Sequence, residues 1–307
     1  MENILDLIII GSGPAGLTAG IYASRAELNA LVIEKNMVSG GQIINTYEVD
    51  NYPGIPGVSG YDLATKFREH CEQLSVQFID GDVTEFKLDG DIKVLTLENG
   101  EKYCAKAVII ATGAKPRNLG IKGEKELSGM GVSYCATCDG AFFRNKETAV
   151  VGGGDVAIED AIFLARLCKK VYVIHRRNEF RAAKSLVSKL NSMENVEIIW
   201  DSTVEEVLGN VMVEGIIVQN VKTNEKRTIS LSGIFVAIGY EPSSQVYEKV
   251  VDTDNRGYII ADESCETSVP GIFAAGDIRT KPLKQIITAA SDGANAVTAV
   301  EKYINQL

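Results

Sequence analysis

The chain has 307 residues, about the length of two ordinary domains. With 45% hydrophobic and 23% charged residues, its composition is that of a folded globular protein. Its net charge of -10 disfavours binding to nucleic acids or anionic membranes, and the apolar run at 7–10 is too short for a signal or membrane segment, so we expect a cytoplasmic protein.

A first nucleotide-binding pattern lies at the start of the chain. The apolar, isoleucine-rich run at 5–10 predicts a buried parallel strand, and it leads into a glycine-rich turn. In such a turn the backbone can approach a pyrophosphate, and the helix that follows directs its N-terminal dipole at the phosphates. A second strand over 28–33 ends at Glu34, whose carboxylate suits a ribose hydroxyl, so FAD or NAD fits and a 2′-phosphate does not. The expected contacts in the turn are Gly11, Ser12, Gly13, Pro14, Ala15 and Gly16.

A pair of cysteines follows in the middle of the chain. Cys135 and Cys138 have the spacing at which a disulfide closes at a helix N-terminus. A zinc site would need more ligands, but no second pair follows and the only histidines are His70 and His175, so we expect no metal. Two structural thiols are the plainer alternative. Asp139 comes next and is a candidate for the proton transfers of a thiol–disulfide cycle, for a helix-start acid, or for both.

A second nucleotide-binding pattern comes after the cysteines. An apolar strand over 148–151 leads into a glycine turn and a helical run to residue 167, and the next strand covers 171–174. This strand ends in basic residues, and a cluster of guanidinium groups can hold a 2′-phosphate, so we expect NADPH here. A solvated basic face is the alternative, but it gives no reason for arginines at the ribose end of the strand. The expected contacts are Gly152, Gly154, Asp155, His175, Arg176, Arg177 and Arg181.

Three further turns of small residues each close an apolar strand, after 107–110, 234–236 and 272–273. The last of them contains Asp277, which suits the ribityl or pyrophosphate-side hydroxyls of a flavin, although an Asp in a turn also caps helices. Two dinucleotide sites of different charge indicate a relay from NADPH to a resident flavin. The expected fold class is α/β with two Rossmann-like dinucleotide-binding domains.

A series of short motifs runs in order along the chain. They are GSGPAG at 11–16, GGQ at 40–42, NYPG at 51–54, CATCDG at 135–140, GGGD at 152–155, HRR at 175–177 with FRA at 180–182, and AAGD at 274–277. Together they resemble the low-molecular-weight, bacterial-type thioredoxin reductases over essentially the whole chain. The resemblance implies an FAD domain formed by residues 1–115 and 243–307, an NADPH domain of residues 116–242 inserted into it, a homodimer, and reduction of thioredoxin.

The resemblance also implies roles for single residues. Cys138 would be the sulfur nearer the flavin and Cys135 the one that attacks thioredoxin, with a rotation between the domains. Two positions depart from the usual pattern: Ala141 precedes the aromatic pair, and Asp155-Val156 stands where Ser or Asn is commoner. They leave open the docking surface for thioredoxin and one NADPH contact. The further flavin contacts implied are Lys35, Gly41, Gln42, Asn51, Val83, Thr112, Gly276, Gln285 and Ile286, besides Glu34 and Asp277.

Other functions fit part of this pattern. Glutathione-type reductases carry their cysteines near the first glycine turn, and ferredoxin–NADP reductases lack the pair, so both fit less well. A dithiol oxidase that returns electrons to oxygen, or a reductase of a peroxiredoxin-type or other thioredoxin-like partner, keeps every motif. A dinucleotide sensor without turnover would bind both cofactors and transfer nothing between them.

Overall fold

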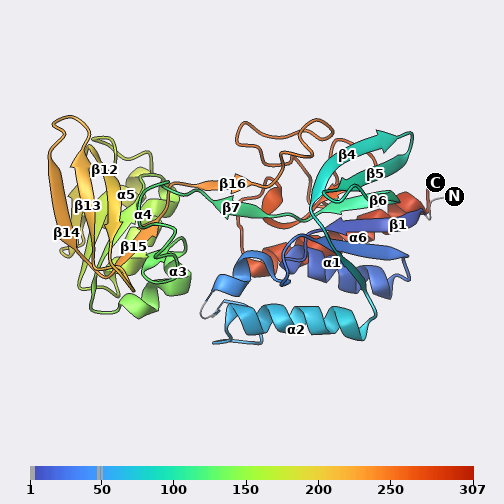
Figure 1. Cartoon of the computed structure of the whole chain (residues 1–307), viewed down its shortest axis with the longest axis horizontal. Helices are drawn as coiled ribbons and strands as arrows, with labels where there is room; N and C mark the ends of the chain where they lie inside the picture. Colours follow the sequence, from blue (N-terminus) through green and yellow to red (C-terminus); the bar gives the residue numbers. More distant parts are fainter. Residues whose placement is uncertain (1–3, 47–48, 50) are drawn as a thin grey trace. The chain divides into compact units, whose positions relative to one another are not determined.

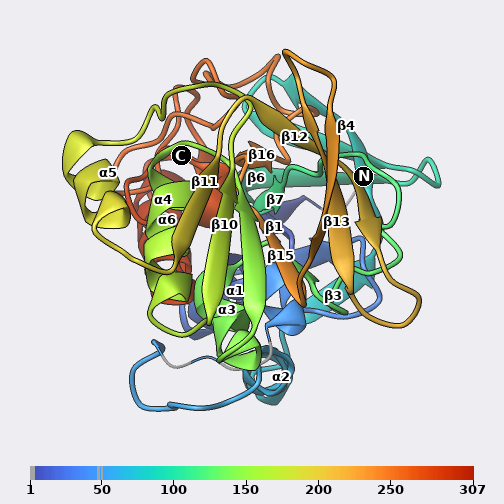
Figure 2. The same cartoon turned by 90° about the vertical axis from the view of Figure 1, so that its left-hand side faces the viewer.

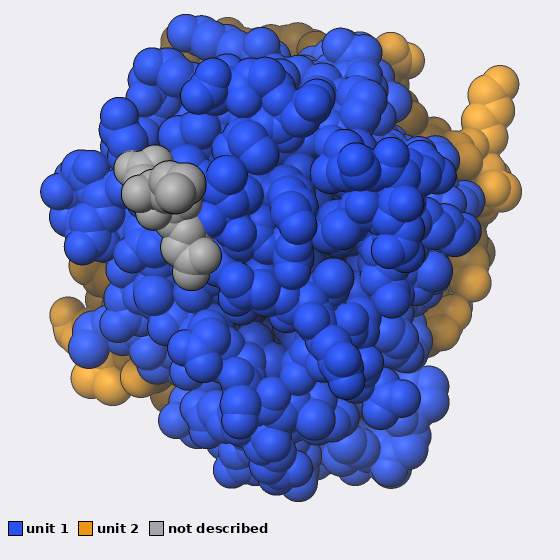
Figure 3. Space-filling view, turned by 90° about the vertical axis from the view of Figure 1, so that its right-hand side faces the viewer, with its two compact units in different colours: residues 1–115, 241–307 blue, residues 116–240 orange. Residues whose placement is uncertain are grey.

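The computed structural model describes residues 4–46, 49 and 51–307. The chain divides into unit 1, which is Met1–Lys115 with Glu241–Leu307, and unit 2, which is Pro116–Tyr240; Figure 3 colours them separately. The segments at the two boundaries, β7 (Ala114–Pro116) and β16 (Tyr240–Pro242), pair as a two-stranded sheet.

Unit 1 is built on a sheet of seven strands in the order β3-β2-β1-β6-β5-β4, with β17 paired to β6. The parallel strands are β1 (Leu5–Ile10), β2 (Ala30–Glu34), β3 (Gln77–Asp80), β6 (Lys102–Ile110) and β17 (Ile272–Ala274). The hairpin of β4 (Val83–Asp89) and β5 (Ile92–Leu97) extends the sheet in antiparallel fashion. The helices are α1 (Pro14–Arg25), α2 (Gly60–Gln73) and α6 (Ile286–Ile304), and two short 3₁₀ turns are η1 (Gly41–Asn45) and η3 (Gly276–Ile278).

Successive side chains of β1 point to opposite faces of the sheet, and both faces are buried. Leu7 and Ile9 point into a cluster with residues of α1 and α6, such as Val297. Ile8 and Ile10 point to the other face, where they pack with Phe86 and other residues of the hairpin and of the 246–278 segment. Helix α1 lies directly against α6, and α2 runs along the outer side of α1 (Figure 1). Since both faces are covered, β1 is apolar at every position except Asp6, whose carboxylate lies 2.7 Å from the Lys106 amine.

Unit 2 repeats this design on a smaller scale. Its parallel sheet has the order β11-β10-β9-β15-β8. These strands are β8 (Val132–Ser133), β9 (Glu147–Val151), β10 (Lys170–Ile174), β11 (Val196–Ile199) and β15 (Gly233–Val236). One face is covered by α4 (Asp155–Ala165) and α5 (Lys184–Asn191), and the other by the antiparallel strands β12 (Ser202–Leu208), β13 (Gly215–Asn220) and β14 (Lys226–Ser230) (Figure 2). A single turn of helix, α3 (Ala136–Asp139), continues into the 3₁₀ turn η2 (Gly140–Phe143).

The α/β class with two parallel-sheet dinucleotide-binding folds is confirmed, and the predicted strands form. The limits of some strands differ from the prediction: β6 begins at Lys102 instead of residue 107, and β2 begins at Ala30 instead of residue 28. For β2 the reason is local, because Glu27 has a φ of 55° and the Leu28 amide donates to the Ala23 carbonyl, so this stretch still completes the end of α1. The helical run after the second glycine turn ends at Ala165, two residues before the predicted position 167.

Candidate functional site

The first glycine turn joins β1 to α1 with backbone shapes that side chains would prevent. Gly11 has a φ of 102°, and a Cβ there would lie 2.6 Å from the Ala111 carbonyl oxygen. A Cβ at Gly16 would overlap the Gly11 carbonyl oxygen. Over the ranges that the structure describes, no side chain caps the N-terminus of α1, where Gly13 is the N-cap and Pro14 the first helical residue. The turn therefore leaves the helix N-terminus available to an anion, as a pyrophosphate site requires.

Glu34 at the end of β2 is held against this turn. Its side chain is buried, with 7% exposure, and its Oε2 accepts hydrogen bonds from the Ser12 amide and hydroxyl, both at 2.7 Å. Oε1 accepts from the Asn36 amide and side chain, both at 2.8 Å. The carboxylate thus lies at the ends of β1 and β2 together, the position at which an acid meets a ribose in this type of fold.

Segments distant in sequence gather around the first turn. A Cβ on Gly41 would lie 3.3 Å from the Gly13 Cα, and one on Gly276 would lie 3.0 Å from the Ala15 Cβ. Asn51 donates to the side chain of Gln285, the N-cap of α6, at 2.9 Å. The structure thus places Gly41 and Gly276 against the first turn and pairs Asn51 with the N-terminus of α6.

The other predicted flavin residues occupy nearby strand ends. Thr112 follows β6 and donates to the Ser243 carbonyl at 2.9 Å. The Gln42 side chain donates to the Ala114 carbonyl oxygen. Val83 is buried at the start of β4, and Lys35 is exposed, with its amine 3.9 Å from the Asp82 carboxylate. Ile286 is the first residue of α6.

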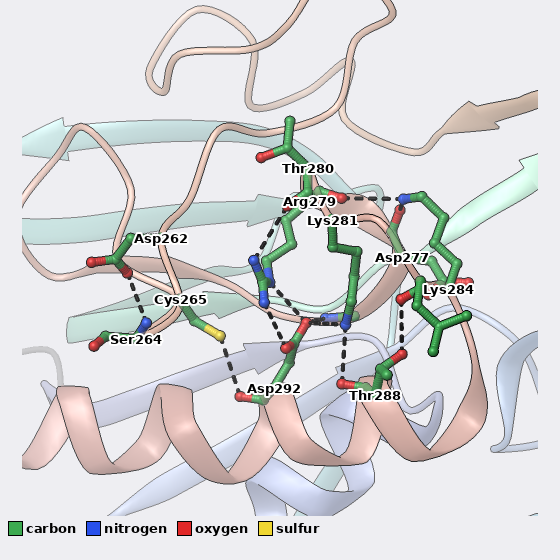
Figure 4. Close-up of polar contacts among 12 residues, drawn as sticks. Asp262, Ser264, Cys265, Asp277, Arg279, Thr280, Lys281, Lys284, Thr288 and Asp292 are labelled. Atoms are coloured by element: carbon green, nitrogen blue, oxygen red, sulfur yellow. Dashed lines mark hydrogen bonds and ion pairs between the residues drawn. The ribbon is translucent and has the colours of Figure 1, made fainter.

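Asp277 lies in η3, directly after β17, and Figure 4 shows its surroundings. Its Oδ1 is buried and has no hydrogen-bond partner among the residues that the structure describes, and burial raises the pKa of its carboxyl. A buried carboxylate oxygen without a donor is costly, so such a group in a folded protein calls for a missing partner. The hydroxyl of a ligand would supply it. The free oxygen of Asp277, the open turn and the buried Glu34 together fit the ribose, pyrophosphate and ribityl parts of FAD.

The second glycine turn joins β9 to α4 in unit 2. Gly154 is the N-cap of α4, and a Cβ there would meet nothing within 4 Å. The Arg181 amide donates to the Gly153 carbonyl at 2.8 Å, and the Ala183 amide donates to Asp155 Oδ1 at 2.7 Å. These two bonds draw the segment after β10 onto the turn.

The basic side chains after β10 are exposed at this place. In the described part of the chain, no ion pair involves Arg176, Arg177 or Arg181. Three guanidinium groups free of carboxylates, beside an open helix N-terminus, fit a nucleotide that carries a 2′-phosphate.

His175 lies below the second turn, inside the unit. It is 6% exposed, and a Cβ on Gly153 would overlap its ring. The rings of Phe180 and Trp200 lie 5.4 and 6.2 Å from it, and 4.4 Å from each other. Burial lowers the pKa of His175, and no described residue forms a hydrogen bond with its Nε2. The histidine predicted as a nucleotide contact therefore supports the turn from beneath, and Trp200, which the sequence did not single out, packs beside it.

The predicted redox pair forms a disulfide. Cys135 is the N-cap of α3 and Cys138 lies within that turn, with their Cα atoms 5.3 Å apart. Ser133 links the pair to Asp139: its hydroxyl donates to Asp139 Oδ2 at 2.6 Å and accepts from the Cys135 amide at 3.1 Å. Burial raises the pKa of Asp139, and the Ser133 hydrogen bond opposes that shift. A carboxyl that holds its proton more readily than usual lies one residue from the second sulfur.

The remaining cysteines do not take part. Cys71, Cys104, Cys168 and Cys265 are buried and are not in disulfides. Within residues 4–46, 49 and 51–307, no group of three or more His, Cys, Asp or Glu is arranged to hold a metal ion. Over the same residues, no helix combines the length and the apolar character needed to cross a membrane.

Comparison with known proteins agrees with this geometry. The family described as pyridine nucleotide-disulphide oxidoreductase matches residues 5–293. A thioredoxin reductase of Peptoclostridium acidaminophilum is 46% identical over 99% of this chain and 98% of its own, and that of Bacillus subtilis is 44% identical over 100% and 96%. The crystal structure of thioredoxin reductase from Streptococcus pyogenes is 45% identical and superposes with a TM-score of 0.89, covering 100% of both chains.

Proposed function

We propose that this chain, which belongs to the pyridine nucleotide-disulphide oxidoreductase family and is an NADPH-dependent thioredoxin reductase, carries out its reaction through Cys135 and Cys138. The observation that carries this assignment is the Cys135–Cys138 disulfide, with Asp139 held beside it by Ser133. The same unit contains the nucleotide turn that ends in free arginines. An electron donor and an electron acceptor site thus belong to one chain.

In this proposal FAD is held by unit 1. The N-terminus of α1 receives the pyrophosphate, Glu34 a ribose, and the free Oδ1 of Asp277 a hydroxyl of the ribityl side. When bound, a flavin accepts a hydride from a nicotinamide and passes two electrons to a disulfide. Unit 2 holds NADPH, with the 2′-phosphate on Arg176, Arg177 and Arg181 and the pyrophosphate on the α4 N-terminus.

The two cysteines then have separate roles. Once reduced, Cys135 attacks the disulfide of thioredoxin as a thiolate, which breaks that disulfide and leaves a mixed disulfide between the proteins. Cys138 attacks the Cys135 sulfur, which releases thioredoxin as a dithiol and restores the Cys135–Cys138 bond.

Asp139 supplies proton transfer in this scheme. Reduction of the Cys135–Cys138 disulfide to two thiols takes up two protons with the two electrons, and these protons leave again when thioredoxin is reduced. The carboxyl of Asp139 is the titratable group nearest to Cys138 in sequence, and its raised pKa suits a group that exchanges protons. The hydroxyl of Ser133 fixes its orientation.

An anaerobic titration tests the function. If NADPH bleaches the yellow absorbance of the purified flavoprotein, and oxidised thioredoxin then restores it, the proposal holds. A flavin that NADPH does not bleach would indicate a dinucleotide sensor. NADPH consumption that oxygen alone supports as fast as thioredoxin would favour a dithiol oxidase. A homodimer and a cytoplasmic location belong to the same proposal, and sedimentation of the holoenzyme tests the first of them.

A further inference from the structure

A buried ionic network lies between the η3 turn and helix α6 of unit 1 (Figure 4). At its centre is Asp292, a carboxylate in the middle of α6 whose side chain is 5% exposed. Arg279 donates to both of its oxygens, from Nε at 2.8 Å and from Nη2 at 2.8 Å. Lys281 donates to Oδ2 at 2.7 Å. Neither the redox chemistry nor the contacts proposed for the cofactors account for this network.

The network holds one specific piece of backbone. Besides the two cations, the Gly276 amide donates to Asp292 Oδ2 at 2.9 Å. Arg279 and Lys281 follow at the other end of the same turn. The carboxylate of Asp292 therefore binds both ends of a stretch of six residues, 276–281, that contains Asp277.

The opposite side of the turn is fixed by Lys284. Its amine donates to the carbonyl oxygens of Asp277 at 2.7 Å and Arg279 at 3.1 Å, and it lies 3.8 Å from the centre of the Tyr258 ring. With its backbone held from both sides, the turn leaves the side chain of Asp277 with Oδ1 unpaired.

Such a network is expensive to bury, so its placement needs a reason. Burial by itself would raise the pKa of Asp292, but the hydrogen bonds from Arg279 and Lys281 outweigh it and lower the pKa, so the group stays ionised. A buried ion pair is weak support for stability, because apolar residues of similar volume often do as well. What an apolar residue could not do is accept from the Gly276 amide and the two cations at once. The network is suited to fixing a conformation.

We propose that Asp292 is a positioning residue for the flavin site: its carboxylate holds the 276–281 turn in the one conformation that presents the free Oδ1 of Asp277 to the ligand. Asp292 does not touch the ligand and acts through Asp277. This inference rests on the proposed function, in which Asp277 binds a hydroxyl of FAD.

The experiment measures FAD affinity by reconstitution of the full-length apoprotein, followed by flavin fluorescence. Asp292→Asn keeps the shape of the side chain but removes the charge that gathers Arg279 and Lys281. It should weaken FAD binding about tenfold or more, the effect of losing one well-placed charged hydrogen bond to the ligand. Asp262→Asn is the matched control, because this exposed carboxylate also fixes a local turn by accepting from the Ser264 and Glu266 amides. It should leave FAD affinity unchanged.

A double variant separates positioning from mere stability. If Asp292 acts through Asp277, adding Asp292→Asn to Asp277→Asn should cost no further FAD affinity. Should the two losses multiply in the double variant, or should Asp292→Asn lower only the melting temperature of the apoprotein, the positioning role is overturned. If Asp277→Asn alone leaves FAD affinity intact, the proposed contact between Asp277 and FAD is wrong, and the positioning role falls with it. NADPH bleaching of the parent holoenzyme tests the proposed function separately.

A milder variant covers the case in which Asp292→Asn does not fold. Lys281→Met removes one donor to Asp292 and leaves the paired bonds of Arg279 in place. It should weaken FAD binding less than tenfold, and this loss should disappear in the Asp277→Asn background. A loss that persists in that background would contradict the positioning role.

Discussion

Cys135 and Cys138 are chemically equal in the disulfide and become unequal only through their surroundings. Cys135 is the N-cap of α3, with its sulfur 3.4 Å from the Thr137 hydroxyl and its amide bonded to Ser133. Cys138 is followed directly by Asp139. The carboxyl proposed to exchange protons is therefore adjacent to Cys138 in the chain, and the Thr137 hydroxyl lies beside the Cys135 sulfur.

Replacing either cysteine by serine tests the division of the reaction into two halves. Cys135→Ser and Cys138→Ser should each abolish NADPH-dependent reduction of thioredoxin, because no dithiol can form. Bleaching of the flavin by NADPH should persist, since it does not need the disulfide. Stopped-flow absorbance follows both halves. Loss of bleaching in both variants would mean that the cysteines serve the cofactor site instead.

Asp139 gives a prediction with a defined pH dependence. Its native pKa is raised above the ordinary value of 3.8 because of burial, so between these two values the native state binds more protons than the unfolded state. Ionisation of Asp139 therefore costs stability as the pH rises through that interval. Asp139→Asn removes the cost: the variant should melt at a higher temperature than the parent at pH 7, with the difference vanishing near pH 3. The same variant should slow reduction of thioredoxin about a hundredfold.

The control for this prediction is Asp252→Asn, at an exposed carboxylate of unit 1. Its melting temperature should follow that of the parent across the same pH range. A difference between Asp139→Asn and the parent that is as large at pH 3 as at pH 7 would show that packing, and not ionisation, explains the stability change.

At the scale of elements, the packing of α6 on α1 decides where the η3 turn lies. Gly293 comes one residue after Asp292, and a Cβ there would overlap the Ala15 carbonyl oxygen in α1. The two helices thus approach to the distance of backbone contact beside the first glycine turn. Glycine is needed at position 293 because the two helices pack closely there. An unusual backbone conformation is not the reason, since α6 has ordinary helical geometry at this point.

Gly293→Ala should therefore destabilise the protein despite the better helix propensity of alanine. The gain in propensity is about 1 kcal/mol at most, whereas overpacking against backbone costs about 1 to 3 kcal/mol or more because a carbonyl group cannot turn aside. We expect a lower free energy of unfolding in urea and weaker FAD binding. Asn295→Ala, at an exposed position of the same helix, should be neutral or slightly stabilising. A Gly293→Ala variant as stable as the parent would contradict this packing.

Much at this scale could be predicted from the sequence, because the information was local. The run at 5–10 is apolar except for Asp6, and the glycine turns at 11–16 and 152–154 follow their strands directly. The network of Asp292 was not predicted. Its partners lie 11 to 16 residues away and meet only when η3 packs on α6. The one available signal was an acid, Asp292, between the small residues of the alanine-rich stretch 289–296.

The placement of the His175 side chain is a second feature that the sequence did not predict. The motif at 175–177 predicts a phosphate site, and nothing in it distinguishes a side chain that contacts the ligand from one that supports the turn. The structure places the buried ring of His175 against Phe180 and Trp200. Trp200 comes from the end of β11, a strand that the sequence patterns did not connect to this site.

At the scale of the whole molecule, two units of similar design carry turns of opposite ribose chemistry. In unit 1 the second strand of the nucleotide fold ends in a buried carboxylate, Glu34, and in unit 2 the corresponding strand ends in exposed arginines. A negative group excludes a 2′-phosphate, and free guanidinium groups attract one. In the proposed function, FAD in unit 1 and NADPH in unit 2 would therefore not compete for one site.

The independence of the two sites can be tested by measuring the affinity for both ligands in a variant of each site. Arg176→Ala combined with Arg177→Ala should weaken binding of 2′,5′-ADP to the holoenzyme by about 1.5 to 3 kcal/mol for each charged hydrogen bond lost, with FAD affinity unchanged. Asp277→Asn should weaken FAD binding and leave the affinity for 2′,5′-ADP unchanged. Titration calorimetry gives the first affinity and apoprotein reconstitution the second. The preference for NADPH over NADH should narrow only in the arginine variant, because NADH lacks the phosphate that the guanidinium groups hold. If the arginine variant loses FAD affinity as well, or if its nucleotide preference is unchanged, the assignment of one cofactor to each unit is wrong.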